Sequence, residues 1–387
     1  MNGPQKIRVL VVDDSVVVRR IISDVLAADP AFEVAGVAAT GKIALAKLDQ
    51  INPDIVTLDM EMPEMDGLTT LREIRKVRRG LPVIMFSTLT QSGAAATINA
   101  LTSGADDYVT KPANVGSVTE AIHQIREALI PKIKLLCARR LSPAGAPRRM
   151  PVTTPPSLPP NVKPRLPNLE RRIEVLAIGT STGGPNALNE LLQGLPGNLP
   201  VPLVIVQHMP PMFTRMLAEH LTAKTPVRTT EAAHGDRLEA GHGWVAPGGR
   251  HMVVFREGSD IRIRLNEDPP ENSCRPSVDV LFRSVAAAYQ DRALGVILTG
   301  MGQDGMRGSE QLCRCGSPIL AQDEASSVVW GMAGAVVHAG LAEAVLPLNQ
   351  LSQLIIRKLH VGRPEWIPSQ ALSATPIQSN SLCLPCH

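Results

Sequence analysis

The stretch Val175-Leu176-Ala177-Ile178-Gly179-Thr180-Ser181-Thr182-Gly183-Gly184 joins four apolar residues to a glycine-rich turn. This pattern predicts a buried strand that runs into a helix. A serine on such a turn stands clear of the sheet, and the backbone N–H groups of the next helix point toward it. Ser181 is therefore a candidate nucleophile with an oxyanion site beside it.

Strand and helix signals alternate through most of the chain. Five short apolar runs occupy residues 7–12, 32–37, 55–58, 83–87 and 108–110, with amphipathic stretches such as 16–28 and 68–77 between them. Further strand candidates are 203–206, 294–298 and 319–321, and residues 241–265 alternate like a β-hairpin. These repeats predict an α/β fold with two doubly wound parallel sheets, the first flavodoxin-like and the second Rossmann-like.

The length of 387 residues favours two domains, and a change of composition indicates where they divide. Nine prolines and several arginines fall within residues 141–170. We therefore expect a first domain at 5–128, an extended linker at 129–170, a second domain at 171–362 and a disordered tail at 363–387.

The composition argues against several classes of protein. The net charge of +3 is too small to indicate nucleic-acid binding, and no DNA-reading motif accompanies the linker arginines. No apolar run reaches the length of about 18 residues that a membrane-spanning helix needs. Six cysteines, and a start from Met1 to Lys6 without a signal-peptide core, predict a cytoplasmic protein with reduced thiols.

Polar residues end four of the five strands expected in the first domain. In a doubly wound sheet the loops at the carboxyl ends converge on one crevice. Three carboxylates there repel one another unless a cation such as Mg²⁺ joins them, and a nearby lysine and hydroxyl suit a phosphoryl group. Helix capping and turn formation are the alternative roles. The residues concerned are Asp13, Asp14, Asp59, Ser87 and Lys111.

The motifs VVDDS (11–15), LDMEMPEMDG (58–67) and YVTKP (108–112) resemble the signature of response-regulator receiver domains. The resemblance covers about residues 5–128 and implies that Asp59 accepts a phosphoryl group from a histidine kinase. It assigns Asp14 and Asp59 as Mg²⁺ ligands, Asp13 as a ligand through water, and Ser87, Lys111 and Tyr108 as residues that sense or relay phosphorylation.

A second set of polar residues ends three strands of the second domain. Ser181 follows the first strand, His208 follows the strand at 203–206, and Asp304 follows the strand at 294–298. A serine hydroxyl needs a base with a pKa of about 7, which histidine supplies, and histidine needs a carboxylate to fix its tautomer. The chain order Ser, His, Asp differs from the Ser, Asp, His order of α/β-hydrolases.

A dinucleotide site is a competing interpretation of the same loop. Gly300, Gly302 and Gly305 form a GxGxxG pattern between a strand and a helix, and Asp323 follows at the end of the next strand. The pattern lies late in its domain, whereas this fingerprint normally follows the first strand. Asp304 would also place a negative charge inside the loop that holds the pyrophosphate.

The motifs GTSTGGP (179–185), VQHMPP (206–211), RPSVDVLF (275–282) and LTGMGQDG (298–305) resemble the catalytic domain of chemotaxis protein-glutamate methylesterases. With the receiver in front, the resemblance extends to about residue 362. It implies a phosphorylation-activated serine hydrolase, without a cofactor for the esterase, that releases methanol from glutamyl methyl esters of methyl-accepting chemoreceptors. It further implies a chemotaxis histidine kinase as phosphodonor, and deamidation of receptor glutamines by some members. By motif position it assigns Ser181 as nucleophile, His208 as base, Asp304 as orienting acid, and Thr182 and Met301 as neighbours of the oxyanion.

Two residues depart from the pattern of that family. Gln303 stands where Asn is common, which changes the packing beside Asp304. Cys274 stands where His is common before the RPSVD run, which removes a polar group from the rim of the crevice. The chain also ends in Cys383-Leu384-Pro385-Cys386-His387, the spacing of a covalent haem site, but haem attachment is not expected without an export signal.

Two sites on one chain predict that the first controls the second. We expect the receiver to cover the crevice that holds the candidate triad until phosphorylation of Asp59 repacks the receiver face near Ser87 and Tyr108. A response regulator with a non-catalytic binding output is the alternative that the residues leave open.

Overall fold

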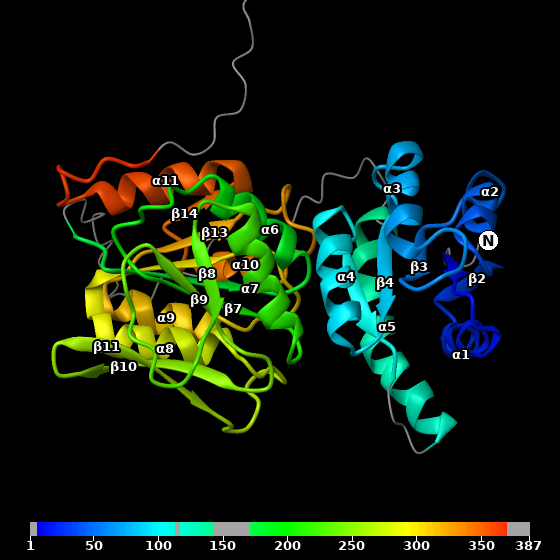
Figure 1. Cartoon of the computed structure of the whole chain (residues 1–387), viewed down its shortest axis with the longest axis horizontal. Coiled ribbons are helices and arrows are strands. Elements are labelled where there is room, and N and C mark those ends of the chain that lie inside the picture. Colours follow the sequence, from blue (N-terminus) through cyan, green and yellow to red (C-terminus); the bar gives the residue numbers. More distant parts are fainter. Residues whose placement is uncertain (1–5, 113–116, 142–170, 370–387) are drawn as a thin grey trace, which may run out of the picture.

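The computed structural model describes residues 6–112, 117–141 and 171–369. These residues form two α/β units, coloured blue to cyan and green to red in Figure 1. Each unit has a parallel sheet of its own with helices packed against it, as the sequence predicts. None of the helices in these ranges combines the length and apolar character needed to cross a membrane.

The first sheet has the strand order 2-1-3-4-5, and all of its strands are parallel. This is the order of a flavodoxin-like doubly wound sheet. Its strands are β1 (Ile7–Val12), β2 (Phe32–Ala38), β3 (Ile55–Asp59), β4 (Val83–Ser87) and β5 (Asp107–Thr110). Its helices are α1 (Val16–Ala27), α2 (Gly41–Ile51), α3 (Gly67–Val77), α4 (Gln91–Thr102) and α5 (Val118–Leu141).

Helix α5 extends further than the sequence prediction allows. Residues 129–141, which we expected in the linker, are the second half of this helix. Leu129, Ile133 and Cys137 are buried at a spacing of four residues, so they continue the apolar face that packs on the first domain. This periodicity outweighs Pro131, which lies inside the helix. The remainder of the predicted linker, 142–170, lies outside the described residues.

The second sheet has seven parallel strands in the order 14-13-12-6-7-9-8. They are β6 (Val175–Thr180), β7 (Leu203–Gln207), β8 (Arg228–Glu231), β9 (His242–Val245), β12 (Ala293–Ile297), β13 (Ile319–Gln322) and β14 (Ala344–Leu346). The chain adds β7 on one side of β6 and β12 on the other, so a crevice opens at the carboxyl end of β6.

Helices and one hairpin complete the second domain. The helices are α6 (Gly184–Gln193), α7 (Phe213–Lys224), α8 (Val278–Tyr289), α9 (Met306–Cys315), α10 (Met332–His338) and α11 (Leu348–His360), with a short 3₁₀ turn at Gln290–Arg292. The predicted hairpin is confirmed as β10 (His251–Glu257) and β11 (Asp260–Asn266). The start of the segment predicted as this excursion is instead β9, a strand of the main sheet.

The second domain also continues past its predicted end at residue 362. Trp366 Nε1 donates a hydrogen bond to the carbonyl of Asn198 at 2.8 Å, and Asn198 Nδ2 donates to the carbonyl of Ile367 at 2.9 Å. These contacts fix residues that we expected in a disordered tail. The rest of that predicted tail, with Cys383, Cys386 and His387, lies outside the described residues.

The two domains touch through one face of each. Helix α4 of the first domain packs against α6 and α7 of the second (Figure 1). Beside it, the ring of Tyr108 at β5 stacks on the ring of Phe213 at the start of α7, with centroids 5.0 Å apart. One cluster of buried apolar side chains runs through this contact and includes both residues. The arrangement places the first domain next to the loops that carry Ser181 and His208.

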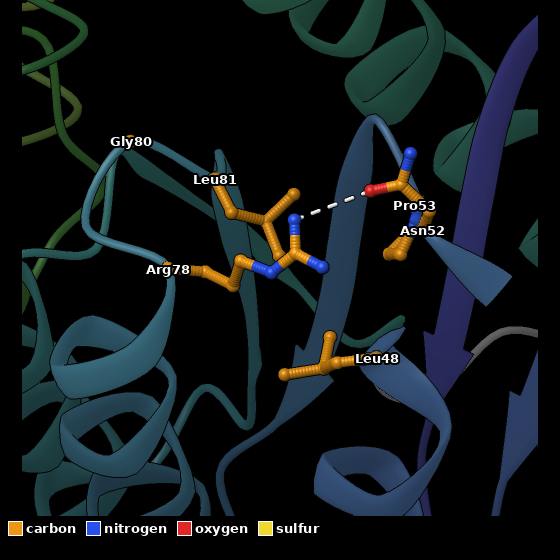
Figure 2. A pocket seen from close by; sticks show the side chains of 6 residues that line it. All are labelled: Leu48, Asn52, Pro53, Arg78, Gly80 and Leu81. Carbon is orange, nitrogen blue, oxygen red and sulfur yellow. Dashed lines mark hydrogen bonds between the residues drawn. The ribbon is translucent and has the colours of Figure 1, made fainter. Parts of the chain in front are cut away.

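A small pocket of about 100 Å³ lies within the first domain. Figure 2 shows Arg78, at the end of α3, donating a hydrogen bond to Asn52 Oδ1 across it at 3.2 Å. Asn52 precedes β3 and Leu81 precedes β4, so the pocket lies at the amino end of the sheet. It is therefore at the opposite edge from the predicted phosphorylation site, and we assign it no function.

Candidate functional site

The carboxylates predicted in the first domain meet at the carboxyl end of its sheet. Ligand oxygens of Asp13, Asp14 and Asp59 lie within 4.8 Å of one another. Lys111 Nζ lies 2.8 Å from Asp59 Oδ1 and 3.1 Å from Asp13 Oδ2. Asp13 and Asp59 are fully buried, whereas Asp14 is exposed. One lysine therefore serves two buried carboxylates.

Lys111 does not fully compensate the negative charge of this cluster, so the cluster can bind a further cation. Burial, followed by the nearby charge of Asp13, raises the pKa of Asp59 to about 6 despite the ion pair with Lys111. Asp59 Oδ2 is buried and has no hydrogen-bond partner among the described residues. An unpartnered oxygen in a set of three carboxylates fits the hard oxygen ligands that Mg²⁺ prefers. The residues present therefore suit the predicted ion.

Ser87 is not turned toward these carboxylates. Its hydroxyl donates to the carbonyl of Gly93 at 3.1 Å and accepts from Thr97 Oγ1 at 2.6 Å, so it is fixed on helix α4. The strand-end position of Ser87 is as predicted, but the structure pairs its side chain with α4 instead of Asp59. This contact links the end of β4 to the helix that touches the second domain.

Ser181 lies on the predicted turn between β6 and α6. Gly183 has φ of +77°, a conformation that favours glycine, and a Cβ on Gly184 would lie 1.9 Å from Gln207 Oε1. These two glycines let the chain turn sharply under the serine. The N–H of Ser181 donates to the carbonyl of Thr299 at 3.0 Å, which joins the turn to the loop after β12.

His208 and Asp304 form a close pair beside this turn. His208 Nε2 lies 2.8 Å from Asp304 Oδ2, and the N–H of His208 bonds to the carbonyl of Thr180, next to Ser181. His208 Nδ1 lies 3.5 Å from Cys274 Sγ. Burial alone would lower the pKa of His208, but the hydrogen bonds and charges of Asp304 and Cys274 together outweigh burial and raise this pKa to about 9.

Asp304 is held by donors that the sequence analysis did not single out. Ser277 Oγ donates to Asp304 Oδ1 at 2.8 Å, and Asn272 Nδ2 donates to the same oxygen at 2.9 Å. The N–H groups of Val278 and Asp279, at the start of α8, donate as well. Burial would raise the pKa of Asp304, yet His208 and these donors hold it below its usual range. One sequence feature could have indicated these donors: Ser277 is a favourable N-cap residue, so it predicts a helix start there. The N–H groups at a helix start bind anions, and here the anion is the Asp304 carboxylate.

The structure places Ser181, His208 and Asp304 in the loops that follow the neighbouring strands β6, β7 and β12, but within the described ranges Ser181 Oγ and His208 form no hydrogen bond. Thr182 Oγ1 donates to Asp107 Oδ2 of the first domain at 2.8 Å, and both side chains are buried. Met301 is 39 % exposed in the loop after β12. The predicted oxyanion roles of Thr182 and Met301 stay predictions.

The glycine loop after β12 differs from a dinucleotide site. Its Asp304 is 2 % exposed and is bonded to His208 and to the start of α8. A buried carboxylate therefore occupies the loop where a pyrophosphate would need backbone donors. The chain thus has two α/β units, each with a parallel sheet. The first carries a cluster of carboxylates and a lysine, and the second carries a serine, a histidine and an aspartate at neighbouring strand ends. Together they define a response regulator joined to a serine hydrolase.

Comparisons with known proteins agree with this class. Residues 9–123 match the family model described as response regulator receiver domain, and residues 176–355 match the model described as CheB methylesterase. A "Protein-glutamate methylesterase/protein-glutamine glutaminase" from Trichodesmium erythraeum is 52% identical over 354 residues, covering 92% of this chain and 99% of that protein. One of the same name from a Nocardioides strain is 52% identical over 368 residues, covering 95% and 99%. This chain belongs to the family of protein-glutamate methylesterases with a receiver domain and a CheB methylesterase domain.

Proposed function

We propose that this chain hydrolyses glutamyl methyl esters of chemoreceptors, with Ser181 as nucleophile, His208 as general base and Asp304 as orienting acid. The 2.8 Å contact between His208 and Asp304 beside the Ser181 turn carries the assignment. Relatives named for methylesterase and glutaminase activity, at 52% identity over nearly their whole length, support the substrate class.

The reaction begins when Ser181 Oγ attacks the ester carbonyl carbon and gives its proton to His208. His208 passes that proton to the departing methoxide, which leaves as methanol, and an acyl-enzyme remains. A water molecule then attacks the acyl carbon, gives a proton to His208, and releases glutamate as Ser181 recovers its proton. Asp304 keeps the imidazole in one tautomer and stabilises its charged form.

The same steps suit a glutamine side chain. Attack of Ser181 on the amide carbonyl gives the same acyl-enzyme, and the proton from His208 then leaves with ammonia instead of methanol. The second half of the names given to the relatives supports this activity. We therefore include receptor-glutamine deamidation in the proposal.

In the unphosphorylated state the receiver restrains the hydrolase. Asp107 Oδ2 accepts the Thr182 hydroxyl one residue from the nucleophile, and Asn186 of α6 donates to the carbonyl of Ala105. Tyr108 stacks on Phe213 in the helix that follows the His208 loop. A large receptor helix cannot occupy a crevice whose rim is bound in this way. Release of these contacts would uncover it.

Phosphorylation of Asp59 supplies the release in this proposal. Asp13, Asp14 and Asp59 would hold Mg²⁺, which neutralises charge on the incoming phosphoryl group when it is bound. Lys111 would then pair with the phosphoryl oxygens, and Ser87 would leave Gly93 and Thr97 on α4. A chemotaxis histidine kinase would be the phosphodonor and the cytoplasm the compartment.

The function is tested with methanol release from methylated receptor membranes. We expect Ser181→Ala to lose turnover by about a thousandfold or more, because the remaining groups only bind the substrate. Circular dichroism should show an unchanged fold for the variant. Turnover that survives this substitution would show that another group is the nucleophile, and a native chain without turnover in any phosphorylation state would indicate a binding output.

The restraint is tested with a fragment that starts near Leu169. Without a phosphodonor it should hydrolyse receptor esters faster than the whole chain, because the contacts of Asp107 and Tyr108 are absent. A small-molecule phosphodonor with Mg²⁺ should raise the rate of the whole chain and leave that of the fragment unchanged. Equal rates for the fragment and the unphosphorylated chain would contradict the restraint.

A further inference from the structure

Cys274 lies against the imidazole that the proposed mechanism uses as a base. Its Sγ is 3.5 Å from His208 Nδ1, and both residues are only partly buried, so small ions can reach them. The thiol comes from the turn before α8, where backbone hydrogen bonds between Glu271 and Cys274 hold it in place. The backbone of this turn therefore holds the Cys274 thiol beside the His208 ring.

The opposite side of the same ring faces a carboxylate. His208 Nε2 lies 2.8 Å from Asp304 Oδ2, so Nε2 carries the proton and donates it to the carboxylate. In the neutral imidazole Nδ1 is then the nitrogen with a free lone pair, and Nδ1 is the ring nitrogen that faces Cys274 Sγ. A carboxylate that orients a histidine in this way is the usual outer-sphere partner of a metal-bound imidazole.

The distance between the two ligand atoms matches a tetrahedral zinc site. Zn–N and Zn–S bonds of about 2.0 and 2.3 Å at a tetrahedral angle place nitrogen and sulfur about 3.5 Å apart. This is the separation observed between His208 Nδ1 and Cys274 Sγ. Ligand atoms of Cys274, His208 and Asp304 also all lie within 4.8 Å of one another. Asp304 is already saturated by donors, so its role here is outside the first coordination sphere.

We propose that this crevice is an inhibitory site for a thiophilic divalent cation such as Zn²⁺, bound between His208 Nδ1 and Cys274 Sγ. Binding displaces the thiol proton, and the proton on Nδ1 where the imidazole is charged, to solvent, and it occupies the lone pair that must accept the proton of Ser181. Water fills the other two coordination positions. Mg²⁺ prefers oxygen ligands, so the receiver carboxylates would hold it instead. The inhibition, though not the binding, rests on the proposed function of His208.

Binding is tested first, with the full chain and a readout that does not depend on turnover. Titration with Co²⁺ should produce a thiolate-to-cobalt charge-transfer band in the native chain, and Zn²⁺ should abolish it. Cys274→Ser should lose that part of the spectrum, whereas Cys313→Ser, which changes a half-buried thiol on α9, should keep it. An unchanged spectrum for Cys274→Ser would overturn the site and leave the thiol as a weak hydrogen-bond donor to His208.

Inhibition is tested by methanol release at constant Mg²⁺ and phosphodonor, each variant being compared with its own rate without Zn²⁺. Cys274→Ser should raise the Zn²⁺ concentration for half-inhibition by about tenfold or more, because one of two protein ligands is lost. The double variant Cys383→Ser/Cys386→Ser should respond like the native chain. The proposal is refuted if the double variant of the tail cysteines loses sensitivity to Zn²⁺, or if Cys274→Ser is inhibited as strongly as the native chain. If the native chain shows the cobalt band but releases no methanol, only the proposed function is refuted.

Discussion

Both sheets place buried carboxylates at their carboxyl ends, but the two sites differ in how these charges are satisfied. In the first domain Asp13 and Asp59 share one cation, Lys111, and Asp59 Oδ2 has no hydrogen-bond partner among the described residues. In the second domain Asp304 accepts from side chains and from the start of helix α8. The first cluster is incomplete without a ligand, whereas the second is complete without one.

The difference corresponds to what each site must do. A receiver has to change state when an ion and a phosphoryl group arrive, so its unbound form keeps uncompensated charge. A hydrolytic site must keep its base in one orientation through the whole reaction, so its carboxylate is fixed in advance. Neutralising the charge of the first site should therefore change stability, whereas removing donors from the second should change the rate of hydrolysis.

The largest effect is expected from loosening Asp304. Ser277→Ala removes a donor to its carboxylate, and a hydrogen bond to a charged group contributes about 1.5–3 kcal/mol. We expect kcat for methanol release to fall about tenfold to a hundredfold with KM little changed, because the residue positions Asp304 and does not touch substrate. Ser277→Thr should restore most of the rate, since it keeps a hydroxyl.

A matched control separates positioning from stability. Ser317 is equally buried and links the carbonyl of Gln290 to the N–H of Ala293, away from the crevice. Ser317→Ala should lower the free energy of unfolding by a similar amount and leave kcat unchanged. If both alanine variants lose the same fraction of kcat, the effect of Ser277 is structural only.

A smaller effect is expected where the two domains meet. Asp107→Ala removes the acceptor of the Thr182 hydroxyl, so the unphosphorylated chain should hydrolyse esters about threefold to tenfold faster. The fully phosphorylated rate should not change, because the proposed release would already break this contact in that state.

Asp106→Ala is the control for this substitution. Asp106 is the neighbouring acid, and in the described part of the chain its carboxylate accepts from Arg75 and from the N–H of Val83, both in the first domain. Its variant should lose stability without a gain in basal activity. A basal rate that rises equally in both variants would mean that general loosening of the receiver, and not the Thr182 contact, releases the hydrolase.

The smallest effect concerns stability without Mg²⁺. Because the pKa of Asp59 is raised to about 6 in the folded chain, its ionisation lowers the free energy of unfolding as pH rises between about 4 and 6. Asp59→Asn should therefore stabilise the Mg²⁺-free chain by about 1–2 kcal/mol at pH 7, with no gain at pH 4, as measured by urea unfolding.

Asp49→Asn provides the comparison for this measurement. Asp49 is an exposed aspartate paired with Arg78 on the surface of the same domain, so its substitution should change stability very little. Added Mg²⁺ should reduce the advantage of Asp59→Asn, since the ion supplies the missing positive charge. An equal gain at pH 4 and pH 7 would exclude the ionisation of Asp59 as its cause.

The sequence predicts which residues lie at strand ends better than it predicts hydrogen bonds between residues that are far apart in the chain. Asp59 is the last residue of β3 and Ser181 is the first residue after β6, so the position of each strand alone places them. Asn272 and Asp107 act through partners far away in sequence, and no local pattern marks such contacts. We expected the linker to begin at residue 129, but the buried face of α5 continues through Ile133 and Cys137 and keeps the chain helical past Pro131.

The hydrogen bond between Thr182 and Asp107 links the evolution of the two domains. Thr182 follows the proposed nucleophile in the second domain, and its hydroxyl is buried against Asp107 of the first domain, so both domains constrain the residue at this position. A substitution of either Thr182 or Asp107 therefore leaves a buried polar group of the other domain without its partner. A chimera that joins this hydrolase to an unrelated receiver would inherit a phosphorylation site but no means of coupling it to the crevice.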